Sequence, residues 1–214
     1  MVDEQDVELT LDGRPHAGLL GVPERAGGLV IFAHGSGSSR LSGRNRYVAG
    51  VLREAGLATL LFDLLTETED HTYSNRFDID LLTRRLLQAS DWSTGQQALA
   101  QMPIGYFGAS TGAAAALKAA AERGPSVAAV VSRGGRPDLA GNALPTVPSP
   151  TLLIVGGNDP TVLDLNRQAL AQLQATARLE IIEGATHLFE EPGTLEEAAR
   201  LARDWLSRYL SGSA

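Results

Sequence analysis

The sequence predicts an α/β fold, a mostly parallel sheet of about eight strands with helices on both faces. Short apolar runs rich in Val, Ile and Leu recur along the 214-residue chain. Such runs are typical of strands that are buried on both faces. Segments with helical periodicity separate most of these runs, and this alternation is typical of a parallel sheet covered by helices.

The apolar runs expected to form strands are residues 7–11, 17–22, 29–33, 59–62, 104–107, 127–132, 152–155 and 179–182. The first two flank Asp12-Gly13, a dipeptide that favours a tight turn, so we expect an antiparallel hairpin. The expected helices are residues 45–55, 78–101, 111–123, 162–175 and 195–210. Each is amphipathic or rich in Ala and is bounded by Gly, Pro or polar residues. Residues 64–75 show no pattern, and we interpret them as a mobile loop.

The composition of the chain excludes several classes of function. With 43% hydrophobic residues, the chain can bury one sizeable core, so we expect residues 1–214 to be a single domain. The net charge of −7 and the lack of a basic run disfavour binding to nucleic acid. The absence of cysteine excludes disulfides, thiolate metal ligands and a catalytic thiol. Without a leader peptide or an apolar run of about 18 residues, the chain is predicted to be cytoplasmic and to bind no membrane.

Ligands of open parallel sheets bind at the carboxyl ends of the strands, so we expect catalytic residues in the loops that follow the strands. Residues 108–112, Gly-Ala-Ser-Thr-Gly, follow a predicted strand and begin a predicted helix. A serine at the apex of such a turn is typical of an exposed nucleophile, and small neighbours let strand and helix approach closely. Ser110 is therefore the candidate nucleophile. The alternatives are a serine-capped helix start and a dinucleotide-binding turn, but the spacing is not G-x-G-x-x-G.

The candidate general base is His187, in the loop after the last predicted strand. Of the other histidines, we interpret His16 and His71 as surface residues. Asp159 follows the strand 152–155, at the same edge of the sheet, and is the candidate carboxylate that orients His187. The alternative role for Asp159 is to open the following helix, and Asp164 is a substitute for it.

The predicted strand 29–33 is followed by His-Gly-Ser-Gly at positions 34–37. A loop in this place can donate a backbone N–H to a tetrahedral oxyanion, and we assign that donor to Ser36. The second donor is the N–H of Thr111, at a helix N-terminus where the dipole favours negative charge. A phosphate-binding turn is the alternative, but the loop lacks the Gly-Lys-Ser/Thr ending of a P-loop. His34 has no histidine at ligand spacing, so we expect it to be structural and expect no metal site.

Together these motifs resemble the α/β-hydrolase superfamily and, within it, compact serine hydrolases similar to dienelactone hydrolases. The resemblance covers the chain from the third strand to the C-terminal helix. It implies an α/β-hydrolase fold, a catalytic triad of Ser110, Asp159 and His187, and an oxyanion hole at Ser36 and Thr111. Dienelactone hydrolases carry a cysteine as nucleophile, and the serine of this chain instead implies hydrolysis of ordinary esters or thioesters.

Two features of the sequence bear on the substrate: a short segment between two predicted strands, and several arginines. Only 18 residues separate Ser132 from Thr151, too few for a large lid domain, so we expect an open pocket. Arg40, Arg133 and Arg136 follow strands and are candidates for binding an anionic substrate. Their alternative role is to pair with nearby carboxylates such as Asp63 and Asp138.

We therefore expect a cofactor-independent hydrolase that cleaves small carboxylic esters through an acyl-enzyme, with anionic esters among the candidate substrates. One alternative is an acyltransferase or amidase that uses the same triad. The other is a non-catalytic domain that binds a small molecule or a nucleotide.

Overall fold

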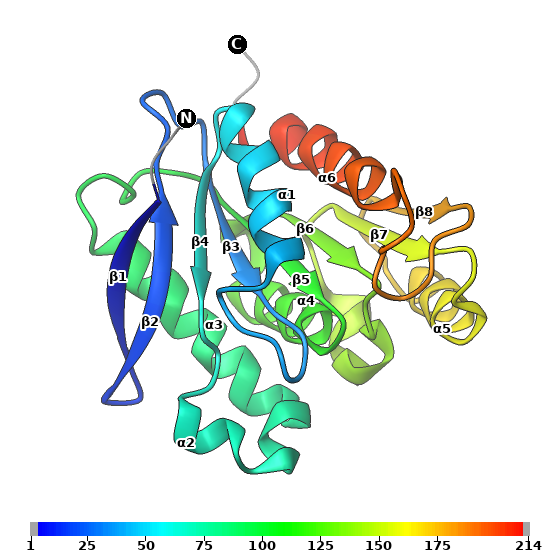
Figure 1. Ribbon diagram of the computed structural model, residues 1–214, viewed down its shortest axis with the longest axis horizontal. Coiled ribbons are helices and arrows are strands. Elements are labelled where there is room, and N and C mark those ends of the chain that lie inside the picture. Colours follow the sequence, from blue (N-terminus) through cyan, green and yellow to red (C-terminus); the bar gives the residue numbers. More distant parts are fainter. Residues whose placement is uncertain (1–3, 212–214) are drawn as a thin grey trace.

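The computed structural model describes residues 4–211, and residues 1–3 and 212–214 of the predicted domain lie outside that range. Its strands are β1 (Glu4–Leu11), β2 (Arg14–Gly21), β3 (Leu29–Ala33), β4 (Ala58–Phe62), β5 (Ile104–Ala109), β6 (Val127–Arg133), β7 (Thr151–Gly156) and β8 (Ala177–Ile182). They form one sheet of order β1-β2-β4-β3-β5-β6-β7-β8, in which β3 to β8 run parallel (Figure 1). The predicted fold class is confirmed, and every predicted strand is present.

The hairpin β1–β2 forms one edge of the sheet, and β2 pairs antiparallel with β4. Its turn has positive φ at both central residues, 46° at Asp12 and 72° at Gly13. This is the backbone that a two-residue hairpin turn needs, so the predicted Asp-Gly hairpin is confirmed.

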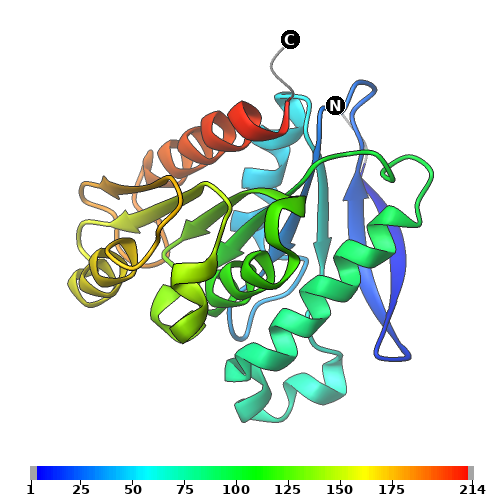
Figure 2. The same cartoon turned by 180° about the vertical axis from the view of Figure 1, so that it is seen from behind.

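Helices cover both faces of the sheet. They are α1 (Gly43–Glu54), α2 (Glu67–Asp70), α3 (Ile79–Thr94), α4 (Thr111–Arg123), α5 (Pro160–Leu170) and α6 (Thr194–Leu210), with 3₁₀ turns η1 (Tyr73–Phe77), η2 (Gly124–Ser126) and η3 (Pro137–Thr146). Figure 1 shows α1 and α6 in front of the sheet, and Figure 2 shows α3, α4 and α5 on the other face. One apolar cluster lies on each face, and the alanines of α4 are almost all buried in one of them. Among residues 4–211, no helix is long and apolar enough to cross a bilayer.

Three predicted segments differ from the structure. The helix predicted for residues 78–101 ends at Thr94, because Gly95 caps it. The helix predicted for residues 162–175 ends at Leu170. Residues 64–75 are not without structure: Thr66 and Glu69 form a capping box that starts α2, and η1 follows.

The strand order explains where a site can form. β3 lies between β4 and β5, and the helices that follow β3 and β5 pack on opposite faces of the sheet. The segments that follow β3 and β5 therefore leave neighbouring strand ends in opposite directions. This opens a crevice at the carboxyl edge of the sheet. Between β6 and β7 the chain forms only η3, and within residues 4–211 no lid domain covers this edge.

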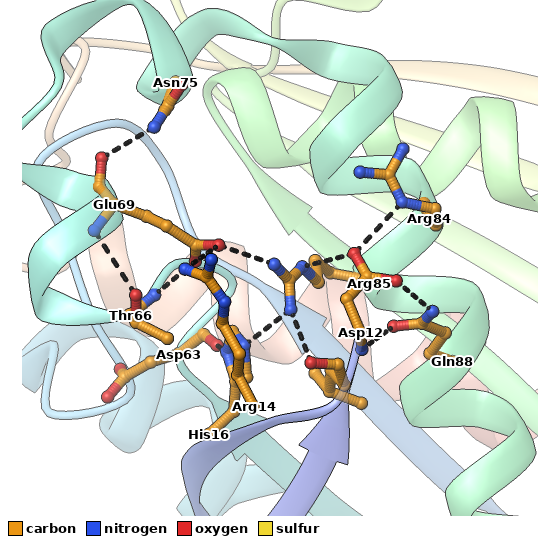
Figure 3. Close-up of polar contacts among 11 residues, drawn as sticks. Asp12, Arg14, His16, Asp63, Thr66, Glu69, Asn75, Arg84, Arg85 and Gln88 are labelled. Carbon is orange, nitrogen blue, oxygen red and sulfur yellow. Dashed lines mark hydrogen bonds and ion pairs between the residues drawn. The ribbon is translucent and has the colours of Figure 1, made fainter.

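A buried polar network joins the hairpin to the helices on one face (Figure 3). Its centre is Arg85 of α3, whose side chain is 2% exposed. Its guanidinium donates to Leu11 O (2.8 Å) and to Glu69 Oε1 (2.7 Å), and it pairs with Asp12 at 3.3 Å. A buried charge is tolerated only with such partners, so the network fixes α2 and the hairpin turn against α3.

His16 belongs to this network, so the prediction that it lies on the surface is wrong. It is 1% exposed. Arg85 Nη1, which can only donate, lies 2.7 Å from His16 Nε2, and His16 Nδ1 lies 2.7 Å from Asp63 O. His16 Nε2 must therefore accept a hydrogen bond while Nδ1–H donates one, which is the neutral form of the ring. His71, in contrast, is exposed as predicted.

The first testable prediction concerns pH. Burial lowers the pKa of His16 below 6.5, and the charge of Arg85 lowers it further. Below about pH 6.5 the unfolded chain binds a proton that the folded chain does not, so stability falls on acidification by at most about 1.4 kcal/mol per pH unit for this group. Urea unfolding between about pH 7.5 and 5.5 measures this loss.

The matched variants are His16→Asn and, as control, His71→Asn at an exposed position. We expect His16→Asn to be less stable at neutral pH but to lose less stability on acidification than the wild type. His71→Asn should follow the wild type. An equal loss in His16→Asn and wild type would show that His16 does not stay neutral in the fold.

Candidate functional site

Ser110 lies at the sharp turn between β5 and α4. Its φ of 50° and ψ of −121° place it in a region that residues other than glycine rarely adopt. The main chain on both sides fixes this conformation: Ser110 N donates to Arg133 O (3.3 Å), and Ser110 O accepts from Ala113 N (3.1 Å) and Arg136 N (3.0 Å). A strained serine costs on the order of 1–3 kcal/mol, and such strain is typical of a functional turn.

Glycine is required around Ser110 because neighbouring segments of the chain approach one another closely there. A Cβ at Gly112 would lie 2.1 Å from Ala33 O at the end of β3, and one at Gly108 would lie 2.4 Å from Ala113 Cα. A Cβ at Gly35 would lie 3.0 Å from that of Ser110. The first turn of α4 therefore packs directly on the end of β3, as the small residues of the motif predict, and Ser110 faces the loop after β3.

His187 and Asp159 come together from the loops after β8 and β7. His187 Nδ1 lies 2.7 Å from Asp159 Oδ2, and Asp159 is 15% exposed. The other carboxylate oxygen of Asp159 accepts from Val162 N (3.4 Å) and caps α5. Asp159 thus fills both roles that the sequence left open. Asp164 is exposed and pairs instead with Arg167.

The bond to Asp159 orients the histidine ring. Because a carboxylate accepts, His187 Nδ1 carries the proton and Nε2 is left free to accept one. Within residues 4–211, no hydrogen bond joins Ser110 to the ring, although both side chains line the same cavity. A contact of this kind is often long in a resting site and shortens when substrate binds.

The loop that carries His187 is held by Glu191, which the sequence analysis missed. Its carboxylate accepts from Thr186 N (3.0 Å) and Thr186 Oγ1 (2.6 Å). These hydrogen bonds lower the pKa of Glu191. Phe189 in this loop has a φ of 56°, which a bulky residue rarely adopts. No sequence motif marks Glu191, because its partner is defined only by the folded loop.

The loop after β3 places Ser36 beside Ser110. His34 Nε2 accepts from Leu64 N (3.0 Å), so its Nδ1–H donates to Gly35 O at 2.9 Å. Since C=O and N–H point in opposite directions across a trans peptide, the N–H of Ser36 faces away from His34. Neither this N–H nor that of Thr111, the first residue of α4, has a hydrogen-bond partner in the described part of the chain.

His34 is structural, as predicted. It is 8% exposed, and burial lowers its pKa. Across residues 4–211, no group of three or more His, Cys, Asp or Glu side chains is arranged to hold a metal ion.

Ser110, His187 and Ser36 line one cavity of about 240 Å³. This is slightly smaller than most ligand pockets and fits a small substrate. Of the three arginines proposed for the substrate, only Arg133 lines it. Arg40 pairs with Asp63 (2.5 Å), and Arg136 pairs with Asp138 (2.8 Å). The structure therefore favours the structural alternative for these two and narrows the substrate-binding prediction to Arg133.

A family model and a solved relative both identify the family of this chain. The model of the "Dienelactone hydrolase family" matches residues 22–211. A solved dienelactone hydrolase from Anabaena variabilis is 56% identical, with a TM-score of 0.95 over 98% of this chain and 99% of that one. Est1E from Butyrivibrio proteoclasticus, 16% identical with a TM-score of 0.82 over 96% of this chain and 99% of that one, shares the fold.

Curated relatives from two strains of Mycobacterium tuberculosis are 57% identical over 209 residues. They carry the provisional name phosphoribosyl transferase. The match covers 98% of this chain but 47% of theirs, so the chain spans about half their length.

The second prediction tests the close approach at Gly112. We expect Gly112→Ala to lower the free energy of unfolding by about 1–3 kcal/mol, because its Cβ would clash with main chain that cannot move aside. Urea unfolding measures the loss. The control is Gly43→Ala at the start of α1, where a Cβ would meet nothing within 4 Å. Equal stability of the two variants would contradict the tight contact between α4 and β3.

Proposed function

Because this chain belongs to the dienelactone hydrolase family, we propose that it hydrolyses small carboxylic esters through an acyl-enzyme on Ser110. One observation carries the proposal: a strained serine shares a cavity with His187, whose Nδ1 is held 2.7 Å from Asp159. This pairing of a nucleophile, a base and an orienting carboxylate is the arrangement that acyl transfer requires. No step of the proposed reaction uses a cofactor.

In the first half of the reaction, Ser110 Oγ attacks the ester carbonyl carbon and its proton passes to His187 Nε2. The carbonyl oxygen becomes an oxyanion. The free N–H groups of Ser36 and Thr111 are its donors, and one such donor is worth about 3 kcal/mol of barrier. His187 then gives the proton to the leaving alcohol as the C–O bond breaks, and the acyl group remains on Ser110.

In the second half, water attacks the acyl-enzyme and gives a proton to His187. A second oxyanion collapses, the bond to Ser110 breaks, and His187 returns the proton to Ser110 Oγ. Asp159 stays ionised throughout and stabilises the imidazolium that forms in each half. The serine nucleophile favours ordinary esters and thioesters as substrates.

The provisional name of the mycobacterial relatives belongs to proteins about twice as long. A nucleophilic serine with a histidine base is not needed to transfer a phosphoribosyl group. The name therefore carries no argument for the part of those proteins that this chain matches. Hydrolysis remains the function that the arrangement around Ser110 supports best.

The third prediction is that Ser110→Ala lowers kcat on a short-chain nitrophenyl ester by at least about a thousandfold. Asp159→Asn should lower it by about ten-thousandfold at most, because the histidine tautomer changes. Asp164 lies on α5, the helix that Asp159 caps, but away from the cavity. Asp164→Asn is therefore the matched control and should retain wild-type activity. Initial rates at saturating ester, with unfolding curves for each variant, give the comparison.

Ester hydrolysis that survives Ser110→Ala would contradict the mechanism. Stabilisation by a dinucleotide without turnover of any ester would favour the binding-domain alternative. Transfer of the acyl group to added alcohols or amines, faster than to water, would identify an acyltransferase that uses the same residues.

A further inference from the structure

Strand β8 forms an open edge of the sheet. It pairs with β7, and within residues 4–211 no strand lies along its outer side (Figure 1). Just before β8, Thr176 O accepts a hydrogen bond from Thr151 N (2.9 Å), and at its end Ile182 O accepts one from Gly157 N (2.9 Å). Both carbonyls therefore point toward β7. Because main-chain groups alternate in direction along a strand, the N–H and C=O groups that point outward belong to residues 177, 179 and 181.

The side chains of β8 form two sets, one on each face of the sheet. Ala177, Leu179 and Ile181 lie on the face of α5, where Leu179 packs against apolar side chains of β7 and α5. Ile181 is 42% exposed, although isoleucine is usually buried. Arg178 and Glu180 lie on the other face and pair with each other. The edge thus carries an apolar stripe on one face and two opposite charges on the other.

We infer that β8 pairs with β8 of a second copy of this chain, antiparallel and about a two-fold axis at Leu179. Each outward-pointing residue then donates one main-chain hydrogen bond to the second copy and accepts one from it. Ala177 of each copy lies opposite Ile181 of the other, so a small side chain leaves room for the large exposed one. The two sheets become continuous, and the open edge and its apolar stripe are covered.

The charges of β8 select this register. With the axis at Leu179, Arg178 of each copy faces Glu180 of the other, in a pair without main-chain hydrogen bonds, where facing side chains are closest. Moving the axis by one residue would place Arg178 opposite Arg178, or Glu180 opposite Glu180, and facing like charges are destabilising. Each copy has a net charge of −7, so a contact between copies depends on such local complementarity.

The opposite edge of the sheet lacks this complementarity. Glu4, Asp6 and Glu8 alternate along β1 and therefore share one face of that strand. A second copy in antiparallel register would meet these carboxylates with its own. Like charges protect an edge strand against self-pairing, so β1 is the protected edge and β8 is the edge that favours a second copy.

Sedimentation velocity of the full chain, from about 1 to 100 μM, measures the association, and we expect a dimer with a dissociation constant below about 100 μM. Arg178→Glu and Glu180→Arg each place like charges opposite one another. Each should weaken the dimer about tenfold or more. The double variant Arg178→Glu/Glu180→Arg restores opposite charges and should dimerise as the wild type does. The control is Arg25→Glu, the same charge change at an exposed position between β2 and β3.

Ile181→Pro tests the main-chain contact. Proline removes the outward N–H of residue 181 and none of the N–H groups that bond to β7, so the monomer should fold while the dimer is lost. Ile181→Val keeps the N–H and should remain dimeric. Unfolding curves show whether each variant is folded, and the charge variants, at partly exposed positions, serve if Ile181→Pro is not.

A wild-type chain that stays monomeric at every concentration would overturn the inference. So would a dimer that neither Ile181→Pro nor the single charge variants weaken, or a double variant that stays monomeric. The inference is separate from the proposed hydrolysis, because no residue of β8 lines the cavity of Ser110. The β8 variants should therefore cleave esters at the wild-type rate, and loss of the dimer and loss of hydrolysis are independent outcomes.

Discussion

The site depends on the close contact between the start of α4 and the end of β3. Gly112 allows this contact, and Gly108 allows the end of β5 to approach the first turn of α4, because a side chain at either position would overlap main-chain atoms. The chain can then turn sharply enough to leave Ser110 at a φ of 50°, facing the loop that holds Ser36. One backbone constraint therefore positions Ser110, the helix N-terminus behind it and the opposite loop. In the proposed reaction, this preorganisation would stabilise a developing oxyanion without rearrangement.

Hydrogen bonds of two buried histidines fix the loops around this contact. His34 joins the loop after β3 to Leu64, and His16 joins Asp63 to Arg85. Both rings are neutral donors and acceptors in these positions. Because Asp63 also holds Arg40, the network of Figure 3 is continuous with the loop that carries Ser36. In contrast, the guanidinium of Arg133 in the cavity has no carboxylate partner among residues 4–211 and packs instead over Phe107 and Phe189.

Much of this arrangement could be predicted from the sequence. Strands β3 to β7 are buried on both faces and are continuous apolar runs, so the sequence shows them clearly. The partly buried strands β1, β2 and β8 were also found. The Gly-x-Ser-x-Gly turn follows from local chemistry. Chain order at the carboxyl edge was enough to place Asp159 and His187 in adjacent loops. The end of α3 was missed although Gly95 signals it, and so was the capping box of Thr66 and Glu69.

Other features depend on residues distant in the chain. His16 is buried by Arg85, 69 positions away, and Arg40 is neutralised by Asp63, 23 positions away. Glu191 gains its role only once the loop around His187 has folded. No local pattern could distinguish Arg133, which has no ion pair within residues 4–211, from Arg136, which pairs with Asp138.

In the proposed mechanism, folding alone makes Ser110 the reactive nucleophile, and labelling with an alkyl fluorophosphonate can establish this. Peptide mass mapping should find a single phosphonylated residue, Ser110, in the folded protein, with no label there after unfolding in urea. Absence of label at Ser110 in the folded protein, or labelling spread over several serines, would contradict the account.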